Sequence, residues 1–250
     1  MPYRHASAAE DYAAYAAGHI LYARPGQTAF PIRLTDEIWG RCLALRQQLD
    51  LPDKLLTFFD PCCGGAYQLT TLALRHGEQI SQICAADVDA AALTLAWQNL
   101  GLLTPAGLDA RAQQIQALYE AHGKANHAEA LAHLPILQAR QAAIEPLSVN
   151  LFAADGGQPD QLLSGLAGTA VDLVLSDVPY GQKAAWGGSL GAGPAGPLHA
   201  LLTALQSVIN PQTILALAMS KDQRAAHPAY RQLGRFQIGK RRIQFLQPLS

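Results

Sequence analysis

The sequence predicts a parallel, doubly wound α/β sheet with helices on both of its faces. From Leu55 onward, short apolar runs alternate with small-residue loops and helical patterns along the chain. The runs are apolar throughout, which is typical of strands buried on both faces of a parallel sheet. The 250 residues, 50% hydrophobic and 15% charged, are enough to build a sizeable core.

Two helices are expected before the sheet, in an N-terminal extension that covers residues 1–50. Ser7 and Glu10 form a capping-box pattern, which predicts a short alanine-rich helix to about Ala17. Thr35 is expected to cap the second helix. The apolar residues of that helix fall on one face, and they are Ile38, Cys42, Leu45 and Leu49.

The strands then follow in chain order. The expected strands are LLTFFD from Leu55, QICAAD to Asp87, SVNLFAAD to Asp155, VDLVLSD to Asp177 and TILALAM to Met219, with a closing hairpin in RFQIGKRRIQFL. A helix to about Arg75 follows the first strand. Asp89 is expected to cap the helix after the second strand, which ends near Asn99 and Gly101.

One stretch, residues 102–146, interrupts the alternation of strands and helices. Because about 45 residues are too many for a structureless loop in a compact domain, we predict a helical insertion above or beside the sheet. Its first helix places Leu108, Ile115 and Leu118 on one face, and its second spans His127 to Ala143. With this insertion, residues 1–250 are expected to form a single domain.

Composition restricts the class of protein. No run approaches the roughly 18 apolar residues of a membrane span, so we expect a cytoplasmic protein without membrane contact. The four cysteines and eight histidines lack the close spacing of metal ligands, so no metal is expected. The net charge of −1 argues against a general nucleic-acid coat.

Acidic residues stand at the ends of four predicted strands: Asp60, Asp87, Asp155 and Asp177. Ligands of doubly wound folds bind at the carboxyl ends of the strands, where the strand order reverses. Any one of these acids could be a helix cap or a turn residue. Four of them in register with successive strands favour a binding site.

The loop after the first strand, Asp60 to Gly65, contains two glycines that let the backbone approach a ligand closely. Asp87 follows about 20 residues later, the distance at which an acid can bind a ribose. The dinucleotide fingerprint G-x-G-x-x-G is absent, which disfavours an NAD-dependent oxidoreductase. A nucleoside without phosphates fits the loop better.

DPCCGGAY, AADVD and SDVPYG resemble motifs of S-adenosylmethionine-dependent methyltransferases that modify amino groups through an Asp/Asn-Pro-Pro-Tyr-type loop. The whole chain further resembles the AviRa family of avilamycin-resistance rRNA methyltransferases. That similarity rests on RPGQTAFPIRLTDEI, DPCCGG, AADVDA, PAGL and DVPYG followed by Trp186. Ala66 departs from the usual glycine of the first motif, and Val178 from the usual proline of the last.

The resemblance implies a Rossmann-like methyltransferase that methylates a guanine base of large-subunit rRNA and confers resistance to an avilamycin-type antibiotic. The implied S-adenosyl-L-methionine residues are Asp60, Pro61, Cys62, Cys63, Gly64, Gly65, Asp87, Val88 and Asp155. Asp87 would hold the ribose and Asp155 the adenine amino group. The implied catalytic residues, which would address the base, are Asp177, Pro179 and Tyr180. A monomer is expected.

The rRNA partner raises the question of where phosphates bind. Residues 51–220 hold 6 Lys and Arg against 13 Asp and Glu, whereas residues 221–250 hold 7 against 1. A basic end on an acidic body is typical of a local phosphate contact, although a solvated hairpin face is an equal alternative. The candidate residues are Arg24, Arg33, Arg235, Lys240, Arg241 and Arg242.

Three alternatives stay open. Pro61-Cys62 matches the nucleophilic pair of pyrimidine C5 methyltransferases, but that pair follows the fourth strand, where this chain has Pro179-Tyr180. We therefore expect Cys62 and Cys63 to be packed loop residues. Another amino-group substrate, such as adenine or a protein glutamine, suits the same loop. A non-catalytic RNA-binding relative would keep the fold without the activity.

Overall fold

The computed structural model describes residues 3–6, 10–16, 19–24, 29–144, 147–179, 186–191 and 196–250. These residues contain one seven-stranded sheet with the order β3-β2-β1-β4-β5-β7-β6. The strands are β1 Leu56–Asp60, β2 Ile80–Asp87, β3 Ser148–Ala153, β4 Leu173–Asp177, β5 Ile214–Ser220, β6 Tyr230–Ile238 and β7 Arg241–Pro248. β1 to β5 pair in parallel and β7 pairs antiparallel with both β5 and β6, so the predicted sheet with a closing hairpin is confirmed.

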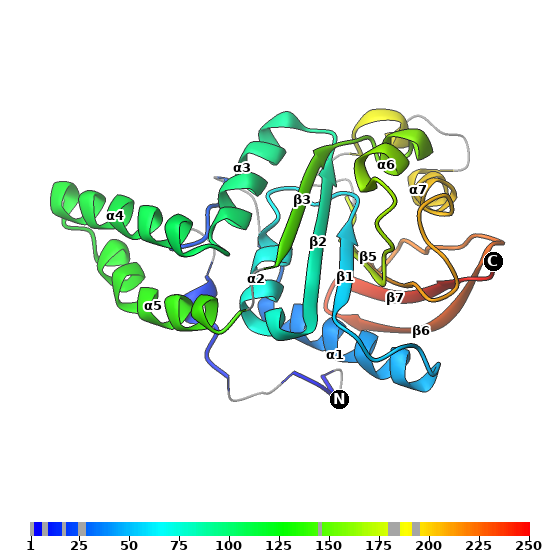
Figure 1. Ribbon diagram of the computed structural model, residues 1–250, viewed down its shortest axis with the longest axis horizontal. Helices are drawn as coiled ribbons and strands as arrows, with labels where there is room; N and C mark the ends of the chain where they lie inside the picture. The colour runs from blue at the N-terminus through cyan, green and yellow to red at the C-terminus, as the bar shows by residue number, and fades with distance from the viewer. Residues whose placement is uncertain are drawn as a thin grey trace.

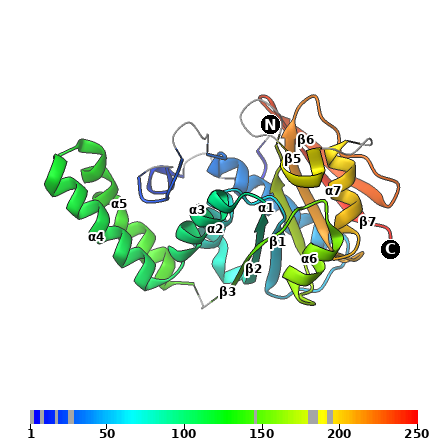
Figure 2. The same cartoon turned by 90° about the horizontal axis from the view of Figure 1, so that it is seen from above.

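Helices cover both faces of the sheet, as predicted (Figures 1 and 2). The helices are α1 Ile32–Gln48, α2 Tyr67–His76, α3 Ala90–Gly101, α4 Pro105–His122, α5 Ala125–Ala142, α6 Pro159–Leu166 and α7 Pro197–Leu205, with 3₁₀ turns η1 Ala13–Tyr15, η2 Gly77–Gln79 and η3 Gly188–Gly191. One buried apolar cluster lies between the sheet and α1 to α3, and a second lies between the sheet and α6 and α7. The central strands are apolar throughout because each face meets one of these clusters.

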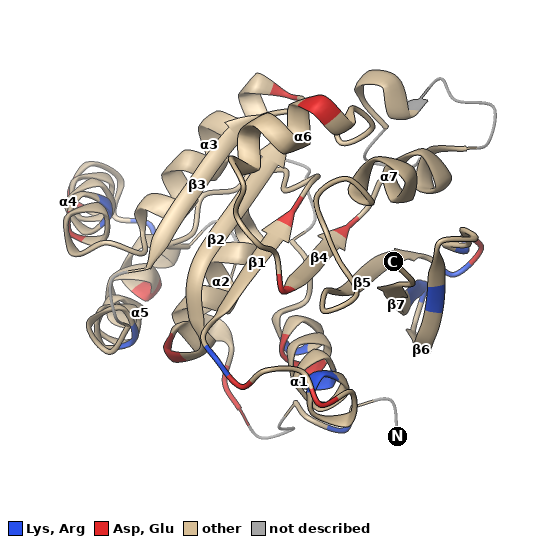
Figure 3. Cartoon of the chain, turned by 45° about the vertical axis from the view of Figure 1, so that its right-hand side comes forward, with Lys and Arg blue, Asp and Glu red and all other residues tan. Residues whose placement is uncertain are grey.

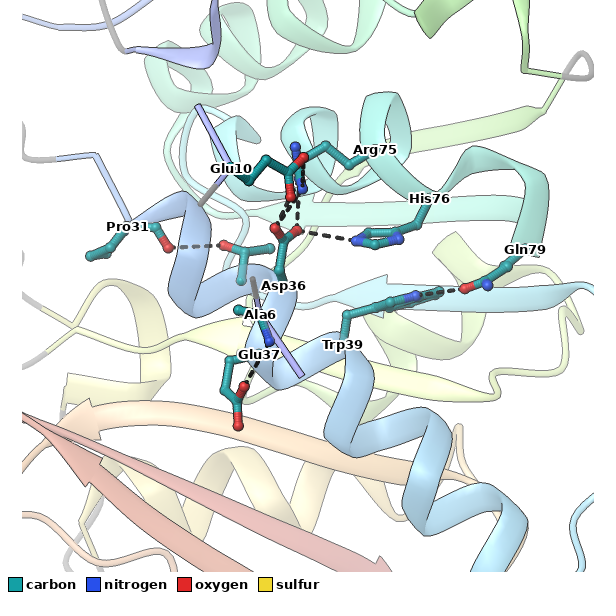
Figure 4. A network of polar contacts seen from close by, with 10 residues as sticks. Ala6, Glu10, Pro31, Asp36, Glu37, Trp39, Arg75, His76 and Gln79 are labelled. Atoms are coloured by element: carbon teal, nitrogen blue, oxygen red, sulfur yellow. Dashed lines mark hydrogen bonds and ion pairs between the residues drawn. The ribbon is translucent and has the colours of Figure 1, made fainter. Parts of the chain in front are cut away.

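The N-terminal extension differs from the prediction. The described part of the expected first helix, residues 10–16, contains only the 3₁₀ turn η1. Ser7, the other member of the predicted capping box, lies outside the described residues. The Glu10 carboxylate pairs with Arg75 of α2 at 2.7 Å (Figure 4).

The second N-terminal helix, α1, begins four residues earlier than predicted. Pro31 is its N-cap residue and Ile32 its first helical residue, so the assignment of Thr35 as the cap was wrong. The Thr35 hydroxyl instead donates to the Pro31 carbonyl within the first turn, at 3.4 Å. The predicted apolar face is confirmed for Ile38 and Cys42, which are buried.

The helical insertion is confirmed, and it lies beside the sheet. α4 and α5 form an antiparallel hairpin that extends away from the sheet in two perpendicular views (Figures 1 and 2). Leu108 and Ile115 are buried as predicted, whereas Leu118 is 40% exposed and does not share their packing. Among the described helices, none is both long and apolar enough to cross a membrane.

Candidate active site

The four predicted acids gather at one edge of the sheet. Asp60 ends β1, Asp87 ends β2 and Asp177 ends β4, while Asp155 follows β3 by two residues. The strand order reverses beside β1, whose neighbours are β2 and β4. Acid positions are visible at the tips of β1 and β4 in Figure 3. The carboxylates therefore lie at the topological switch point, the usual ligand site of this fold.

The loop between β1 and α2 is fixed by backbone hydrogen bonds to both strands. Within the loop, the Cys62 N–H donates to Asp60 Oδ1 at 3.0 Å. The Cys63 N–H donates to the Ala86 carbonyl of β2 at 2.9 Å, and the Gly64 N–H donates to Asp87 Oδ2 at 2.8 Å. These bonds hold the loop across the carboxyl ends of β1 and β2.

Ala66 occupies a position where glycine was expected. Its φ of 53° lies in the left-handed region, and its side chain is fully buried. Its N–H donates to the Cys63 carbonyl at 2.8 Å, which closes the loop before α2 begins. The surroundings accept the alanine methyl group, at a backbone cost of about 1 to 2 kcal/mol. The departure from the glycine pattern therefore leaves the loop geometry intact.

The glycines of the loop have different functions. Gly64 has a φ of 53°, so it uses the backbone freedom that only glycine has at little cost. At Gly65, an added Cβ would lie 2.5 Å from Leu95 Cδ2 of α3. The missing side chain of Gly65 thus permits close packing of α3 against the loop.

Asp60 is a buried carboxyl group among other carboxylates. Burial is the main cause that raises the pKa of Asp60 to about 7, and the carboxylates of Asp87 and Asp177 act in the same direction. The Cys62 N–H lowers it. Because the charged neighbours named here are anions, the site favours a cationic ligand.

Cys62 and Cys63 are free thiols in the same cluster. Burial raises the pKa of both thiols well above the usual value of 9.0, and the nearby carboxylates of Asp60 and Asp87 add to the effect. A thiol that stays protonated is a poor nucleophile. The geometry agrees with the expectation that the cysteines are packed loop residues.

Asp87 and Val88 form the next side of the site. Asp87 accepts from the Gly64 N–H through Oδ2 and from the Asp89 N–H through Oδ1, at 2.8 and 2.9 Å. Asp89 in turn caps α3 by accepting from the Ala91 N–H at 2.8 Å, as predicted. Val88 is 49% exposed at the same edge, which leaves an apolar surface beside an oriented carboxylate.

The Asp155 carboxylate accepts hydrogen bonds from two backbone N–H groups. Its Oδ1 accepts from the Gly157 N–H at 2.9 Å, and its Oδ2 accepts from the Ser189 N–H of η3 at 2.5 Å. Asp155 therefore fixes η3, which follows the D-x-P-Y sequence of residues 177–180 along the chain. Each carboxylate oxygen has a second lone pair for a ligand.

The predicted catalytic stretch begins at the end of β4. Val178 is fully buried, and its N–H donates to the Ala218 carbonyl of β5 at 3.0 Å. The Pro179 carbonyl accepts from Gln223 Nε2 at 3.5 Å. Asp177 is partly exposed at the strand end, while Tyr180 lies outside the described residues.

Two residues of the site have no signal in the sequence. Gln223 lies in the loop after β5 and reaches Pro179 from 44 residues away. Asn99, predicted only as a helix end, donates to the Gly65 carbonyl at 2.8 Å. Both contacts depend on the arrangement of the strands, which a single sequence does not show.

Several of the predicted phosphate-binding residues have protein partners. Arg24 pairs with Asp89 at 3.2 Å, and the Arg33 guanidinium lies over the Tyr3 ring at 4.0 Å. Arg242 donates to the Gln223 carbonyl at 2.5 Å, and Arg241 lies 5.4 Å from the centre of the Phe30 ring. These four side chains contact the protein and are therefore less available to phosphates than the pattern predicted.

Arg235 and Lys240 are exposed on the closing hairpin. β7 begins beside the carboxyl end of β5, since Arg241 pairs with Ser220, so the hairpin turn lies at the edge of the sheet that carries the acids. Lys221 joins the turn because its N–H donates to the Lys240 carbonyl at 2.9 Å. Figure 3 shows the basic positions of this hairpin at one end of the sheet.

Two open hollows lie elsewhere, at the outer edge of the sheet. Their volumes are about 410 and 440 Å³, and they flank β3 near Trp97 and Asp160. The first is lined mainly by apolar side chains and carries no carboxylate of the cluster. Within the described ranges, no group of three or more His, Cys, Asp or Glu side chains is arranged to hold a metal ion.

The protein belongs to the class of Rossmann-like methyltransferases. This class has a sheet of this strand order, a glycine-containing loop after β1 and acids at the neighbouring strand ends. Residues 1–241 match the family described as rRNA methyltransferase AviRa. A 23S rRNA (guanine(2535)-N(1))-methyltransferase of Streptomyces viridochromogenes is 39% identical over 241 residues, which are 96% of this chain and 93% of the relative. The chain belongs to the rRNA methyltransferase AviRa family.

Solved structures agree with this assignment. The rRNA methyltransferase aviRa from Streptomyces viridochromogenes has a TM-score of 0.87 at 37% identity, over 99% of this chain and 96% of that one. The N-terminal domain of human METTL16 in complex with SAH has a TM-score of 0.51 at 13% identity, over 92% of this chain and 75% of that one. The second likeness extends to the fold alone.

Proposed function

We propose that this protein transfers a methyl group from S-adenosyl-L-methionine to N1 of a guanine in 23S rRNA. The observation that carries the proposal is the group of strand-end carboxylates around the buried Asp60, beside the loop at residues 61–66, with the sequence DVPY from Asp177 at the end of β4. The relative at 39% identity is named for this reaction. Resistance to an avilamycin-type antibiotic would be the consequence, in a cytoplasmic, monomeric protein.

The donor set fits the proposed cofactor. S-adenosyl-L-methionine carries a sulfonium and an ammonium cation, which complement the acidic residues around Asp60. Residues Pro61 to Gly65 and Asp60 would hold the methionine part, and Asp87 the ribose hydroxyls. Val88 offers apolar surface to the adenine ring, and the Asp155 carboxylate would accept from its amino group. When bound, the cofactor supplies an electrophilic methyl group.

Asp177 would act on the target base. Guanine N1 carries a proton, which must leave as the N1 lone pair forms the bond to the methyl carbon. A carboxylate at the end of β4 can accept that N1–H and take the proton. The Pro179 carbonyl would orient the neighbouring amino group, and Tyr180 would stack on the base. Holding the base next to the methyl group supplies much of the acceleration.

The closing hairpin would contact the rRNA backbone. Lys221, Arg235 and Lys240 are exposed at or near the edge of the sheet that carries the acids. Removing such cations should weaken RNA binding and flatten its salt dependence. We assign a smaller part in phosphate binding to Arg24, Arg33, Arg241 and Arg242, because these side chains already contact the protein.

Asp177→Asn tests the proposal. We expect kcat to fall by about 10² to 10⁴-fold, because the variant no longer accepts the proton. Calorimetry should show S-adenosyl-L-methionine binding close to that of the wild type. Asp222→Asn, an exposed acid in the loop after β5, is the matched control and should keep full activity.

Mapping of methylated nucleotides identifies the target. The rRNA of cells that express the wild type should carry a new N1-methylguanine, which is absent with Asp177→Asn. Near-normal turnover of Asp177→Asn would contradict the assigned role. A methylated adenine or protein amide in place of the guanine would overturn the substrate.

A further inference from the structure

Asn99, near the end of α3, is a fully buried polar residue that the proposed reaction does not use. Its Oδ1 accepts from the Tyr22 N–H at 2.8 Å. Its Nδ2 donates to the Tyr22 carbonyl at 3.0 Å and to the Gly65 carbonyl at 2.8 Å. One side chain therefore joins the N-terminal segment to the loop after β1.

The N-terminal segment, residues 19–24, follows the edge of the candidate cofactor site. Ile20 and Leu21 are fully buried, which fixes the backbone of the segment. At its far end, Arg24 pairs with Asp89 at 3.2 Å, and the Asp89 N–H donates to Asp87. The segment is thus joined to the loop at residues 61–66 through Asn99, and it contacts Asp89 after β2 through Arg24.

Arg111 of α4 holds the same segment from the other side. Its Nε donates to the Ile20 carbonyl at 2.8 Å, and its Nη2 donates to the His19 carbonyl at 3.2 Å. The guanidinium also lies over the Tyr22 ring at 4.2 Å. A continuous path of contacts runs from the helical hairpin through residues 19–22 to Asn99 and Gly65.

We propose that Asn99 and Arg111 are positioning residues for the cofactor loop, and that the helical hairpin supports the cofactor site through them. This inference rests on the proposed function, since it assigns residues to the binding of S-adenosyl-L-methionine. Asn99 fixes the Gly65 carbonyl, and hence the loop that spans Asp60 and Asp87. Arg111 fixes the backbone on which Asn99 depends.

The amide of Asn99 fits its surroundings in a way that a carboxylate does not. Two of its three bonds are donated by Nδ2 to carbonyl oxygens. In Asn99→Asp, an acceptor faces those two carbonyls at nearly unchanged volume. The substitution therefore removes the polar match with the loop and creates no cavity.

The experiment measures the affinity for S-adenosyl-L-methionine by calorimetry, together with KM and kcat for full-length variants. We expect Asn99→Asp to raise both Kd and KM for the cofactor by about tenfold, with kcat and the KM for RNA within about twofold. Arg111→Met should raise the Kd by about threefold, because it acts through one more link. A purely structural defect would lower the active fraction, and so the apparent kcat, at unchanged KM.

Two matched controls are available in the chain. Asn150→Asp removes an amide donor to the Gly165 carbonyl of α6, a 2.8 Å bond on the other face of the sheet. Arg140→Met removes an exposed cation from the same helical hairpin. Neither control should change the cofactor affinity by more than about twofold.

The outcomes separate the inference from the proposed function. If the wild type does not bind S-adenosyl-L-methionine, the proposed function is wrong. If the wild type binds but both Asn99→Asp and Arg111→Met bind equally well, the positioning inference is wrong. Should Asn99→Asp not fold, Arg111→Met decides: a raised Kd with unchanged kcat supports the inference, and an unchanged Kd overturns it.

Discussion

Two clusters of acids in the described part of the chain, one around the buried Asp36 and one around the buried Asp60, differ in what neutralises them. In the first, between α1 and α2, Asp36 contacts the guanidinium of Arg75 at 2.7 Å and His76 Nε2 at 3.1 Å (Figure 4). Glu10 pairs with the same Arg75. In the second cluster, at the carboxyl ends of the strands, the charged groups that shift the pKa of Asp60 are other carboxylates.

The pKa shifts of the two clusters run in opposite directions. Burial opposes ionisation of Asp36, but hydrogen bonds from His76 and Arg75 hold its pKa below the usual value of 3.8. Burial raises the pKa of Asp60 to about 7, with Asp87 and Asp177 acting in the same direction. The first cluster is electrostatically complete within the protein. In the second cluster, the charged groups that shift the pKa of Asp60 are acids, an arrangement that favours a cationic ligand.

The largest expected effect is on stability. Asp36→Asn leaves Arg75 buried with only Glu10 as a charged partner, so the free energy of unfolding should fall by about 3 kcal/mol. Urea titration measures the change. Glu10→Gln, which removes a more exposed partner of the same arginine, should cost about 1 kcal/mol or less. Equal losses in the two variants would contradict the account of the network.

Asp60→Asn should weaken cofactor binding and, unlike Asp36→Asn, should not lower stability. The affinity for S-adenosyl-L-methionine should fall about tenfold or more at pH 8, because the ligand cation loses its buried counter-charge. The thermal stability of the free protein at pH 8 should rise, because a buried ionised group is removed. Calorimetry and thermal unfolding measure the two quantities. A loss of stability would indicate that Asp60 is a structural acid like Asp36.

The pH dependence should distinguish the two clusters in the wild type. Between pH 4 and 7 the folded state keeps the Asp60 proton that the unfolded chain has released, so this contribution is present at low pH and lost as the pH rises to about 7. The Asp36 contribution is present above its usual pKa of 3.8 and lost as the pH falls further. The stability of Asp60→Asn should no longer change between pH 4 and 7 through this group. The stability of Asp36→Asn should lack the loss that Asp36 causes at low pH.

Cofactor binding should follow the ionisation of Asp60. If the ionised form binds the cation, the Kd falls about tenfold from pH 6 to pH 8 as the carboxyl group loses its proton. Asp60→Asn should remove this dependence. A pH-independent Kd in the wild type would contradict the link between Asp60 and the cofactor.

The smallest expected effect is that of Cys62→Ser. Since burial and the nearby carboxylates keep the thiol protonated, kcat should stay within about twofold of the wild type. Single-turnover methylation measures it. Abolished methyl transfer with normal cofactor binding would instead support the alternative that Cys62 is the nucleophile.

The local patterns in the sequence predict most of the fold. Buried strands, the hairpin and the Asp89 cap follow from apolar runs and from a side chain that bonds its own neighbours. The strand-end acids follow from the parallel arrangement of the strands. These features depend on residues close together in the chain, which is why a single sequence reveals them.

The failures occur where distant partners compete with local ones. Glu10 pairs with Arg75 across 65 residues, and the Tyr22 backbone bonds to Asn99 across 77 residues. Gln223 reaches Pro179 only because β4 and β5 are adjacent. Such contacts depend on the packing of whole elements, which the local patterns do not contain.

The helical hairpin also affects the order in which the chain assembles. β2 and β3 pair although the insertion separates them, so their pairing requires closure of a long loop. α4 and α5 bring the two ends of that loop together, as shown by the bond from Gln141 Nε2 at the end of α5 to the Leu103 carbonyl at 3.3 Å. A hairpin that forms early would shorten the effective loop, and each halving of loop length lowers the entropic cost of closure by about 0.6 kcal/mol. The edge strand β3 would then join the sheet faster than its distance along the chain suggests.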